Sequence, residues 1–398
     1  MIIEKAHLYV EKYSRTEREM LLDFVREDEF IYFRNRGDYA IGMRLPENQY
    51  EPTMLLLHNC ASMPIREGAI LTVDMEKLLE LRENYNDGNQ ANERPATVFL
   101  EISDGASFTD LILNIENSIT NYVDKETVFY SGPLWPCALD ATKEPFQLNI
   151  WNVGQGNTNS ISDQNNLTLF DFGASLYYSA SQLKAIIRDH LYLFDGKKRV
   201  SLIISHWDSD HCNLLCVADA ALLQKICCVF FPPEIITLTA KQAVARIKAY
   251  CKYQVAIPPA RRAIPRKCGI QEVHRGSRYI LFTGETCKDL NKSGLLLTLC
   301  SETAMAFLTA DHSSYQVWDK MYTSVAINDK KLHVVVPHHG GNCGKVAVRS
   351  AAHPGIAAVS VGSNGYGHPW RKVLDMYRRA HYNVIRTDRC GHDIIIHM

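Results

Sequence analysis

The largely apolar run Val200–Ile204 ends directly in Ser-His-Trp-Asp-Ser-Asp-His, residues 205–211. A short apolar run is typical of a buried strand, and the carboxyl end of a strand is where an α/β sheet usually holds its functional site. Imidazole and carboxylate groups are metal ligands, and a solvated loop rarely concentrates them. In an extended turn, residues two apart also point the same way. The segment therefore predicts a metal site on an α/β sheet, with four candidate ligands: His206, Asp208, Asp210 and His211.

The chain has 398 residues, more than one domain usually contains, so two domains are expected. Its formal net charge is -1, from 43 basic and 44 acidic residues, so any binding of nucleic acid must come from a local patch. No apolar run approaches the roughly eighteen residues of a membrane helix, and the start of the chain lacks the features of a signal peptide. We expect a soluble, cytoplasmic protein that makes no membrane contact.

Twelve cysteines are scattered along the chain without a CxxC pair. Reduced and mostly buried thiols explain this pattern better than a disulfide framework or a zinc ribbon. Cys212, directly after His211, is expected to pack under the following helix and not to bind a metal.

A proline-containing segment, Ser131–Pro145, reads as a linker, because proline removes backbone donors and fixes φ. It separates an N-terminal α+β domain, residues 1–145, from a second domain, residues 146–398. For the N-terminal domain the sequence predicts strands at Ile31–Phe33, Thr53–His58 and Thr97–Ile102, helices at Ser14–Arg26 and Phe108–Tyr122, and an exposed loop at Asn84–Arg94.

After Pro145, strands alternate with helices, which predicts a layered α/β domain with enough strands for two sheets. The predicted helices are Ser179–Leu191, Asn213–Leu223, Thr239–Tyr250 and Trp370–Ala380. The predicted strands are Gln147–Val153, Leu167–Phe172, Val200–Ser205, Ile226–Phe231, Gly294–Leu299, Ala304–Thr309, Leu332–Val336, Ile356–Val361, Val384–Thr387 and Asp393–His397.

Polar residues follow three more of these strands: Asp171 with Gly173, Asp311, and the pair His338 and His339 before two glycines. Each alone is ambiguous, because an aspartate at a strand end often forms a turn and a histidine pair often lies on the surface. The joint order of these motifs is much less common by chance.

In that order the chain resembles the metallo-β-lactamase superfamily, and within it the soluble hydrolase-like domain of the competence protein ComEC. The resemblance covers about Phe146–Met398. The closer similarity is carried by Asn152-Val-Gly-Gln-Gly-Asn157, Pro337-His-His-Gly340, Ser360-Val-Gly-Ser-Asn-Gly-Tyr-Gly-His-Pro369 and Arg386-Thr-Asp-Arg389. It implies an αββα sandwich with two divalent metal ions at one edge of the two sheets.

The resemblance also implies roles for individual residues. His206 and Asp208 would belong to a first metal site, and Asp210, His211 and His339 to a second. Asp311 would bridge the two sites, and His338 is the less expected ligand of its pair. Asp171 would orient the loop around His206, since an imidazole ligand needs its other nitrogen held.

The chain departs from the superfamily pattern in two places. Asp208 stands where the commoner pattern has histidine, which shifts metal preference from zinc alone towards manganese or magnesium. The histidine of the third motif is missing from Cys287–Gly294, where Asp289, Asn291 or Ser293 offer oxygen instead, and His274 lies too far upstream to assign. The first metal is therefore expected to be weakly held, or absent until substrate supplies a ligand.

Two metal ions sharing a hydroxide need no serine or cysteine nucleophile. Asp210 is expected both to ligate and to orient that hydroxide. His368 is expected to contact substrate or to donate a proton to the leaving oxygen, with capping of its own helix as the alternative. His338 would either contact substrate or support a ligand.

The leading functional interpretation is metal-dependent phosphodiester hydrolysis, with nucleic acid as the preferred substrate. The local patch that would bind its backbone comprises Arg246, Lys248, Lys252, Arg261, Arg262, Arg266 and Lys267, which a solvated helix face and loop explain equally well. The alternatives are hydrolysis of a small nucleotide and a partner-binding regulatory module with a degenerate metal site. Residues 1–145 would recruit DNA, a protein partner or another copy of the chain.

Overall fold

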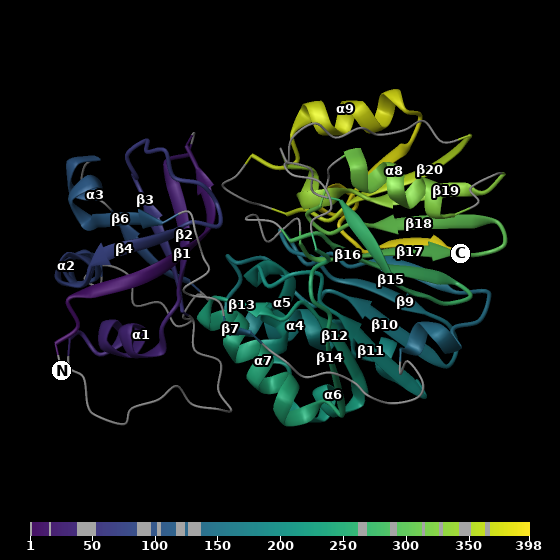
Figure 1. Cartoon of the computed structure of the whole chain (residues 1–398), viewed down its shortest axis with the longest axis horizontal. Coiled ribbons are helices and arrows are strands. Elements are labelled where there is room, and N and C mark those ends of the chain that lie inside the picture. The colour runs from purple at the N-terminus through teal and green to yellow at the C-terminus, as the bar shows by residue number, and fades with distance from the viewer. Residues whose placement is uncertain are drawn as a thin grey trace.

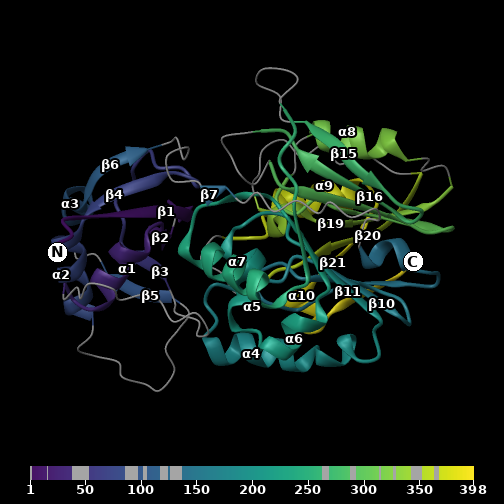
Figure 2. The same ribbon diagram turned by 60° about the horizontal axis from the view of Figure 1, so that its bottom comes forward.

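Three large β-sheets organise the part of the chain that the structure describes (Figures 1 and 2). This computed structural model describes residues 2–15, 17–37, 53–85, 97–101, 105–116, 124–125, 137–261, 269–286, 293–312, 315–325, 329–341, 352–362 and 367–398. One sheet has six strands and precedes the other two, which have seven strands each. A small two-stranded sheet joins β7 (Asp124–Lys125) to β13 (Glu234–Ile235).

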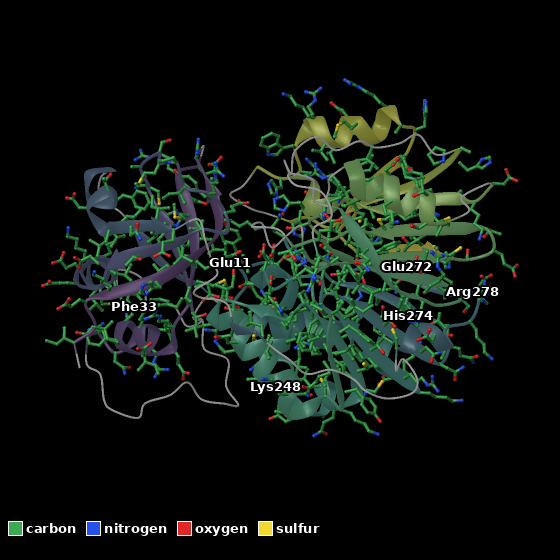
Figure 3. All side chains as sticks on the ribbon, viewed as in Figure 1. Glu11, Phe33, Lys248, Glu272, His274 and Arg278 are labelled. Atoms are coloured by element: carbon green, nitrogen blue, oxygen red, sulfur yellow. The ribbon has the colours of Figure 1, made fainter. Side chains whose placement is uncertain are left out.

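The N-terminal sheet has the strand order β5-β3-β2-β1-β4-β6. Its strands are β1 (Lys5–Ser14), β2 (Glu19–Phe24), β3 (Met54–His58), β4 (Ile70–Asp74), β5 (Thr97–Glu101) and β6 (Ile112–Glu116), and its helices are α1 (Glu27–Arg34), α2 (Met75–Tyr85) and α3 (Gly105–Leu111). Leu8 and Leu22 of the sheet share a buried core with Phe33 of α1 and Leu78 of α2. This part is α+β, as expected, and Figure 3 labels Phe33 within it.

Two secondary-structure predictions in this part were wrong. Ile31–Phe33 lies in helix α1, whose first turn carries three acidic residues that favour a helix N-terminus. The predicted helix Ser14–Arg26 contains strand β2. The backbone N–H of Glu17 does donate to the Ser14 hydroxyl, at 3.2 Å, but this contact lies in the turn between β1 and β2.

Only the start of the predicted helix Phe108–Tyr122 is helical, because α3 ends at Leu111 and strand β6 begins at Ile112. Residues 117–122 lie outside the described residues. The predicted loop Asn84–Arg94 starts with the last two residues of α2, and the rest of it is outside the described residues.

The second part contains two sheets with the orders β14-β12-β11-β10-β9-β8-β22 and β15-β16-β17-β18-β19-β20-β21. The first consists of β8 (Gln147–Ile150), β9 (Asn159–Ser162), β10 (Asn166–Phe170), β11 (Arg199–Ile203), β12 (Cys228–Phe231), β14 (Tyr253–Ala256) and β22 (Ile394–His397). The second consists of β15 (Ile270–Arg275), β16 (Tyr279–Gly284), β17 (Leu295–Cys300), β18 (Ala304–Leu308), β19 (Lys331–Val335), β20 (His353–Val359) and β21 (Asn383–Arg386).

Helices cover the outer faces of both sheets. On the first sheet they are α4 (Ala180–Asp189), α5 (Ser209–Val217), α6 (Ala220–Lys225) and α7 (Leu238–Tyr250), and on the second α8 (Tyr315–Ser324) and α9 (Arg371–Arg379). A short helix, α10 (Thr387–Cys390), follows β21. All ten strands and four helices predicted after Pro145 have counterparts, although the second predicted helix is divided into α5 and α6. Strands β9, β13, β14, β15 and β16 and helices α8 and α10 were not predicted.

Side-chain alternation along the strands produces the layers. On β11, Leu202 packs towards Leu214 of α5, whereas Ile203 packs between the sheets with Leu297 of β17. On the second sheet, Phe307 faces outward against Trp318 of α8. Burial alternates between the two faces because successive strand residues point to opposite sides. The second part is an αββα sandwich, which confirms the expected fold class.

The described portion of the predicted linker, residues 137–145, is packed and not free. Cys137 and Leu139 are buried in the core between the sheets, and the backbone N–H of Ala138 donates to the Ser201 hydroxyl at 2.8 Å. These residues form the short 3-10 turn Ala138–Ala141 on the second part of the chain. The division into domains at residue 145 stays a prediction.

The described residues include nine cysteines, and six of them are buried, as the sequence predicted. Among the helices that the structure describes, none combines the length and hydropathy that crossing a bilayer requires.

Candidate metal centre

Four strand ends meet at one edge of the αββα sandwich. Strands β10 and β11 pair in parallel, and so do β18 and β19 of the other sheet. The carboxyl ends of parallel strands lie at the same edge of a sheet, which is where α/β folds place their sites. Asp171 follows β10, Asp311 follows β18, and the segments that carry the candidate histidines follow β11 and β19.

The six predicted ligands lie close together. His206 Nε2 is 3.5 Å from Asp208 Oδ2 and 3.8 Å from Asp311 Oδ2. His211 Nε2, on the first turn of α5, is 3.4 Å from Asp311 Oδ1. Two groups of potential ligand atoms therefore form, each within 4.8 Å, and they share His211: His206, His211 and Asp311, and Asp210, His211 and His339.

Three of the imidazoles present the same nitrogen to the centre. The Nδ1 atoms of His206, His211 and His339 contact the Ser205 hydroxyl at 2.9 Å, the Asp171 carboxylate at 2.8 Å and the Ser360 carbonyl at 2.9 Å. Their Nε2 atoms are buried and have no hydrogen-bond partner, and neither does either carboxylate oxygen of Asp210. Buried polar atoms are normally paired, so this cluster is what a metal site without its ion looks like.

Asp171 holds this arrangement in place. Its carboxylate accepts hydrogen bonds from the Ser205 backbone N–H at 2.6 Å, the Ser205 hydroxyl at 2.8 Å and the Asn157 amide at 2.6 Å, besides the contact with His211. The structure thus connects Asp171 directly to His211, and to His206 only through Ser205.

The charges of the centre oppose the cost of burial. Burial raises the pKa of Asp210, but the charge of Lys12 and the neighbouring imidazoles of His339 and His211 outweigh it and leave the pKa below its ordinary value. Burial likewise raises the pKa of Asp311, but the neighbouring His338 and His211 outweigh burial and hold this pKa well below its usual range. Burial lowers the pKa of His211, but Asp171 and Asp311 raise it well above its ordinary value.

His338 and His339 point in different directions although they are neighbours. Both have a left-handed backbone, with φ 51°. His339 Nε2 lies 3.3 Å from Asp210 Oδ2, whereas His338 Nδ1 lies 2.6 Å from Asp311 Oδ2. A Cβ on Gly341 would overlap the rings of His338 and His368, so glycine is required there.

His368 lies beside the centre, with its ring 5.2 Å from that of His338. Its Nδ1 is 3.3 Å from the Gln155 amide nitrogen. Burial and the charges of His338 and His339 lower the pKa of His368 to about 2, so its ring is neutral. Helix α9 begins two residues after Pro369, and its N-cap is Trp370.

The two glycine segments that carry the closer resemblance lie against each other under His368. A Cβ on Gly362 would come within 2.5 Å of Gly154 Cα, and the Ser360 hydroxyl donates to the Gly156 carbonyl at 2.7 Å. Gln155, which contacts His368, belongs to the first of these segments.

Sequence reasoning missed two residues of the centre, Glu11 and Lys12 on β1. Lys12 Nζ is 3.5 Å from Asp208 Oδ2 and 3.9 Å from Asp311 Oδ2. The Ser209 hydroxyl donates to Glu11 at 2.9 Å. Figure 3 shows Glu11 where the N-terminal sheet meets the sandwich. In the sequence, a Glu-Lys pair inside a strand looks like part of an ordinary solvent-exposed strand. The sequence therefore does not indicate that these two residues belong to the metal centre.

The residues offered in place of the third-motif histidine are only partly described. Ser293 is buried, and Leu295, two residues further along the chain, donates from its backbone to the carbonyl of Ser205, beside His206. Asp289 and Asn291 lie outside the described residues. His274 is far from the centre, on β15 against Asp140 (Figure 3). Cys212 is fully buried among the helix-facing core residues, as predicted.

These observations test the fit of a metal at each site. Asp210, His211 and His339 offer one carboxylate and two imidazoles with unpaired buried atoms, and they fit a divalent ion. At the first site, the ammonium of Lys12 lies beside the carboxylates of both Asp208 and Asp311. The first site is therefore less suited to a divalent ion than the second.

One residue of the predicted basic patch has a different role. Arg246 is buried, and it donates from Nε to the Leu215 carbonyl at 2.9 Å and from its guanidinium to the Ala218 carbonyl. It satisfies the end of helix α5, so including it in a DNA-binding patch was wrong. Lys248, Lys252 and Arg261 are exposed, and Arg262, Arg266 and Lys267 lie outside the described residues.

Comparison with known proteins gives one sequence relative and several weak structural ones. No protein-family model matches the chain. ComE operon protein 3 of Bacillus subtilis (strain 168) is 24% identical over 287 residues, which cover 67% of this chain and 34% of that protein. The match thus spans about a third of the relative's length.

Two solved structures show the level of structural similarity. Tm1679, a metal-dependent hydrolase of the β-lactamase superfamily, is 13% identical, with a TM-score of 0.37, and covers 64% of this chain and 100% of its own. CmlA, a diiron β-hydroxylase from Streptomyces venezuelae, is 12% identical, with a TM-score of 0.37, and covers 96% of this chain and 69% of its own. Both TM-scores are low. The sequence match, the αββα layers and the motifs at the strand ends support a metallo-β-lactamase fold and a ComEC-like protein.

Proposed function

We propose that the chain is a metal-dependent hydrolase that cleaves phosphodiester bonds in nucleic acid. The observation that carries this proposal is the set of imidazoles of His206, His211 and His339, which hold Nδ1 in hydrogen bonds and aim unpaired Nε2 atoms at aspartates. An arrangement of this kind supports metal binding more than it supports stability, since burying unpaired polar atoms is costly.

Asp210, His211 and His339 would hold a divalent ion, zinc or manganese, with magnesium as a further option. The family resemblance implies a second ion on His206, Asp208 and Asp311. A bound ion supplies Lewis acidity, which activates water and polarises a phosphoryl oxygen.

The chain's own residues would prepare the site for a phosphodiester. Asp171 fixes the ring of His211, and Asp311 holds Nδ1 of His338 at 2.6 Å. His338 and His368 lie side by side next to the candidate ligands, where they would contact the substrate. With its pKa lowered to about 2, His368 suits a neutral hydrogen-bonding role better than proton donation, so we assign it to substrate contact.

The test is cleavage of single-stranded and plasmid DNA by the full chain loaded with manganese. We expect cleavage, and a loss of about 100-fold or more in Asp210→Asn, because that change removes a charged ligand. Asp195→Asn is the matched control, since its carboxylate is 74% exposed. The proposal fails if the loaded chain cuts no DNA, or if Asp210→Asn cuts equally fast. Fewer than about one bound ion per chain after loading would favour the regulatory module instead.

Hydrolysis of a small nucleotide is the second candidate, and the burial of the centre favours it. The exposure of Asp210 is 1% and that of His211 is 0%, so a single nucleotide would reach them more readily than a duplex. Cyclic and short phosphorylated nucleotides belong in the same assay, and a rate higher than that on DNA would select this candidate.

A further inference from the structure

Strand β1 contains an irregularity where it passes the metal centre. Its register on β2 pairs Val10 with Leu22 but Lys12 with Leu21, so Glu11 has no partner of its own on β2. This is a β-bulge, in which one extra residue redirects the side chains that follow.

The bulge places Lys12 on the face of the sheet that meets the sandwich. Val10 and Leu22 belong to the N-terminal core, whereas Leu21, opposite Lys12, packs against Leu176 of the second part. Directly paired residues share a face of a sheet. Without the bulge, Lys12 would point with Val10 into the N-terminal core.

Glu11 anchors the bulge to helix α5. Its carboxylate accepts a hydrogen bond from the Ser209 hydroxyl at 2.9 Å and lies 3.5 Å from the Ser209 backbone nitrogen, at the helix N-terminus. A carboxylate at this end of a helix is electrostatically favourable. The next residue along the helix is Asp210, so the anchor fixes β1 directly beside the metal ligands.

Lys12 Nζ faces the same two oxygen atoms as His206 Nε2. The ammonium is 3.5 Å from Asp208 Oδ2 and 3.9 Å from Asp311 Oδ2, and the imidazole nitrogen is 3.5 Å and 3.8 Å from these atoms. The side chain of Lys12 is only 2% exposed, and Nζ has no hydrogen-bond partner. A metal ion on those two oxygens would lie beside a buried ammonium, and like charges in such an environment repel strongly.

We propose that the Lys12 ammonium takes the place of the first metal ion, so that the centre holds a single divalent ion on Asp210, His211 and His339. The N-terminal sheet then supplies the second positive charge of the centre. The absence of a third-motif histidine agrees with this proposal, because a site filled by lysine needs no further protein ligand. The inference builds on the metal centre of the proposed function, but it concerns the number of ions and not the reaction.

The test counts manganese in the full chain after loading and gel filtration, by mass spectrometry of the metal and by electron paramagnetic resonance. We expect one ion per chain and the six-line spectrum of an isolated Mn²⁺ ion. Lys12→Met should bind two ions that give an exchange-coupled spectrum, because Asp311 would bridge them. Lys12→Arg, which keeps the cation, should bind one.

Asp208→Asn in the wild-type background provides a measurement that does not depend on the folding of Lys12→Met. If Asp208 pairs with Lys12, this variant keeps its single ion, whereas a two-metal centre would lose one. Two ions in the wild type, one ion in folded Lys12→Met, or an ion lost in Asp208→Asn would each overturn the inference. One ion without DNA cleavage would contradict the proposed function alone, and two ions with cleavage would contradict this inference alone.

Discussion

Asp171 accepts a hydrogen bond from His211 Nδ1 at 2.8 Å, and the same carboxylate accepts two from Ser205, whose hydroxyl lies 2.9 Å from His206 Nδ1. One carboxylate at the end of β10 therefore orients the two histidines that follow β11. Asp171 has a left-handed backbone with φ 62°, which aspartate tolerates better than most residues.

Asp171→Asn should weaken metal binding about 10- to 100-fold, because asparagine offers one acceptor oxygen in place of two. It should also lower the free energy of unfolding by about 1–3 kcal/mol, since buried donors lose their partner. Competition with a chromophoric chelator and urea unfolding of the metal-free chain measure the two effects. Asp195→Asn should change neither quantity. Unaltered metal affinity in Asp171→Asn would show that Asp171 does not orient the ligands.

Substitution should distinguish the roles of His338 and His339. Asparagine is the suitable replacement at both, because it tolerates their left-handed backbone. His339→Asn should lose bound metal, since Nε2 of His339 faces Asp210. His338→Asn should keep the metal and lower the hydrolysis rate about 100-fold, since this ring lies beside His368 and does not face Asp210. Metal analysis beside a cleavage assay checks both, and loss of metal from His338→Asn would assign that histidine to the ligands instead.

Gly173 allows β10 and α5 to approach each other behind the centre. A Cβ at this position would overlap the backbone carbonyl of Asp210 and come within 2.5 Å of the His211 carbonyl carbon. Gly173→Ala should therefore displace both ligands, weaken metal binding at least 10-fold and destabilise the chain by about 1–3 kcal/mol. Gly196→Ala, where a Cβ meets nothing within 4 Å, should affect stability only through its φ of 69° and leave metal binding unchanged. Chelator competition and urea unfolding distinguish the two variants.

His190 and Asp393 form an ion pair away from the metal centre, with Nε2 and Oδ2 3.0 Å apart. Burial lowers the pKa of His190, but the hydrogen bond to Asp393 outweighs it and raises the pKa above its ordinary value. A raised folded-state pKa gives stability that is complete below the unfolded value of about 6.5 and lost as pH rises through the folded value.

For Asp393 the pKa is lowered, chiefly by His190 against the effect of burial, so its contribution is present above about pH 3.9 and lost as pH falls through the folded value. The wild type should therefore exceed Asp393→Asn in unfolding free energy by about 1–2 kcal/mol at pH 5.5, and by less at pH 9. Urea titrations at both values of pH check this, and a difference independent of pH would contradict it.

The strands and helices after Pro145 were predictable because the apolar runs of the αββα sandwich are buried on both faces and end in polar turns. In the N-terminal sheet the same reasoning was wrong. Its strand β2 also has two buried faces, with Leu22 in the N-terminal core and Leu21 against Leu176, so consecutive apolar residues imitated a helix. Local periodicity does not indicate that a second layer will cover the far face.

The candidate site shows the same limit. Asp171, His206, Asp311 and His339 each follow a strand that the sequence identifies, and parallel pairing brings strand ends together. Lys12 comes from another sheet, and its position depends on a bulge that no local pattern predicts. Arg246 shows the opposite error, because a basic residue on a helix suggests a surface patch whether its side chain points outward or inward.

Arg246 and Lys248, two residues apart on α7, should therefore respond differently to substitution. Arg246→Ala removes the donors to the Leu215 and Ala218 carbonyls and should destabilise the chain by about 2–3 kcal/mol. Replacing the exposed Lys248, Lys252 and Arg261 with alanine should leave stability within about 0.5 kcal/mol. If all three contact phosphates of single-stranded DNA, the dependence of binding on log salt should fall in slope by about 2, because each contact contributes roughly 0.7. Urea unfolding and fluorescence anisotropy at several salt concentrations measure these effects. An unchanged slope would mean that DNA, if bound, follows a different surface of the sandwich.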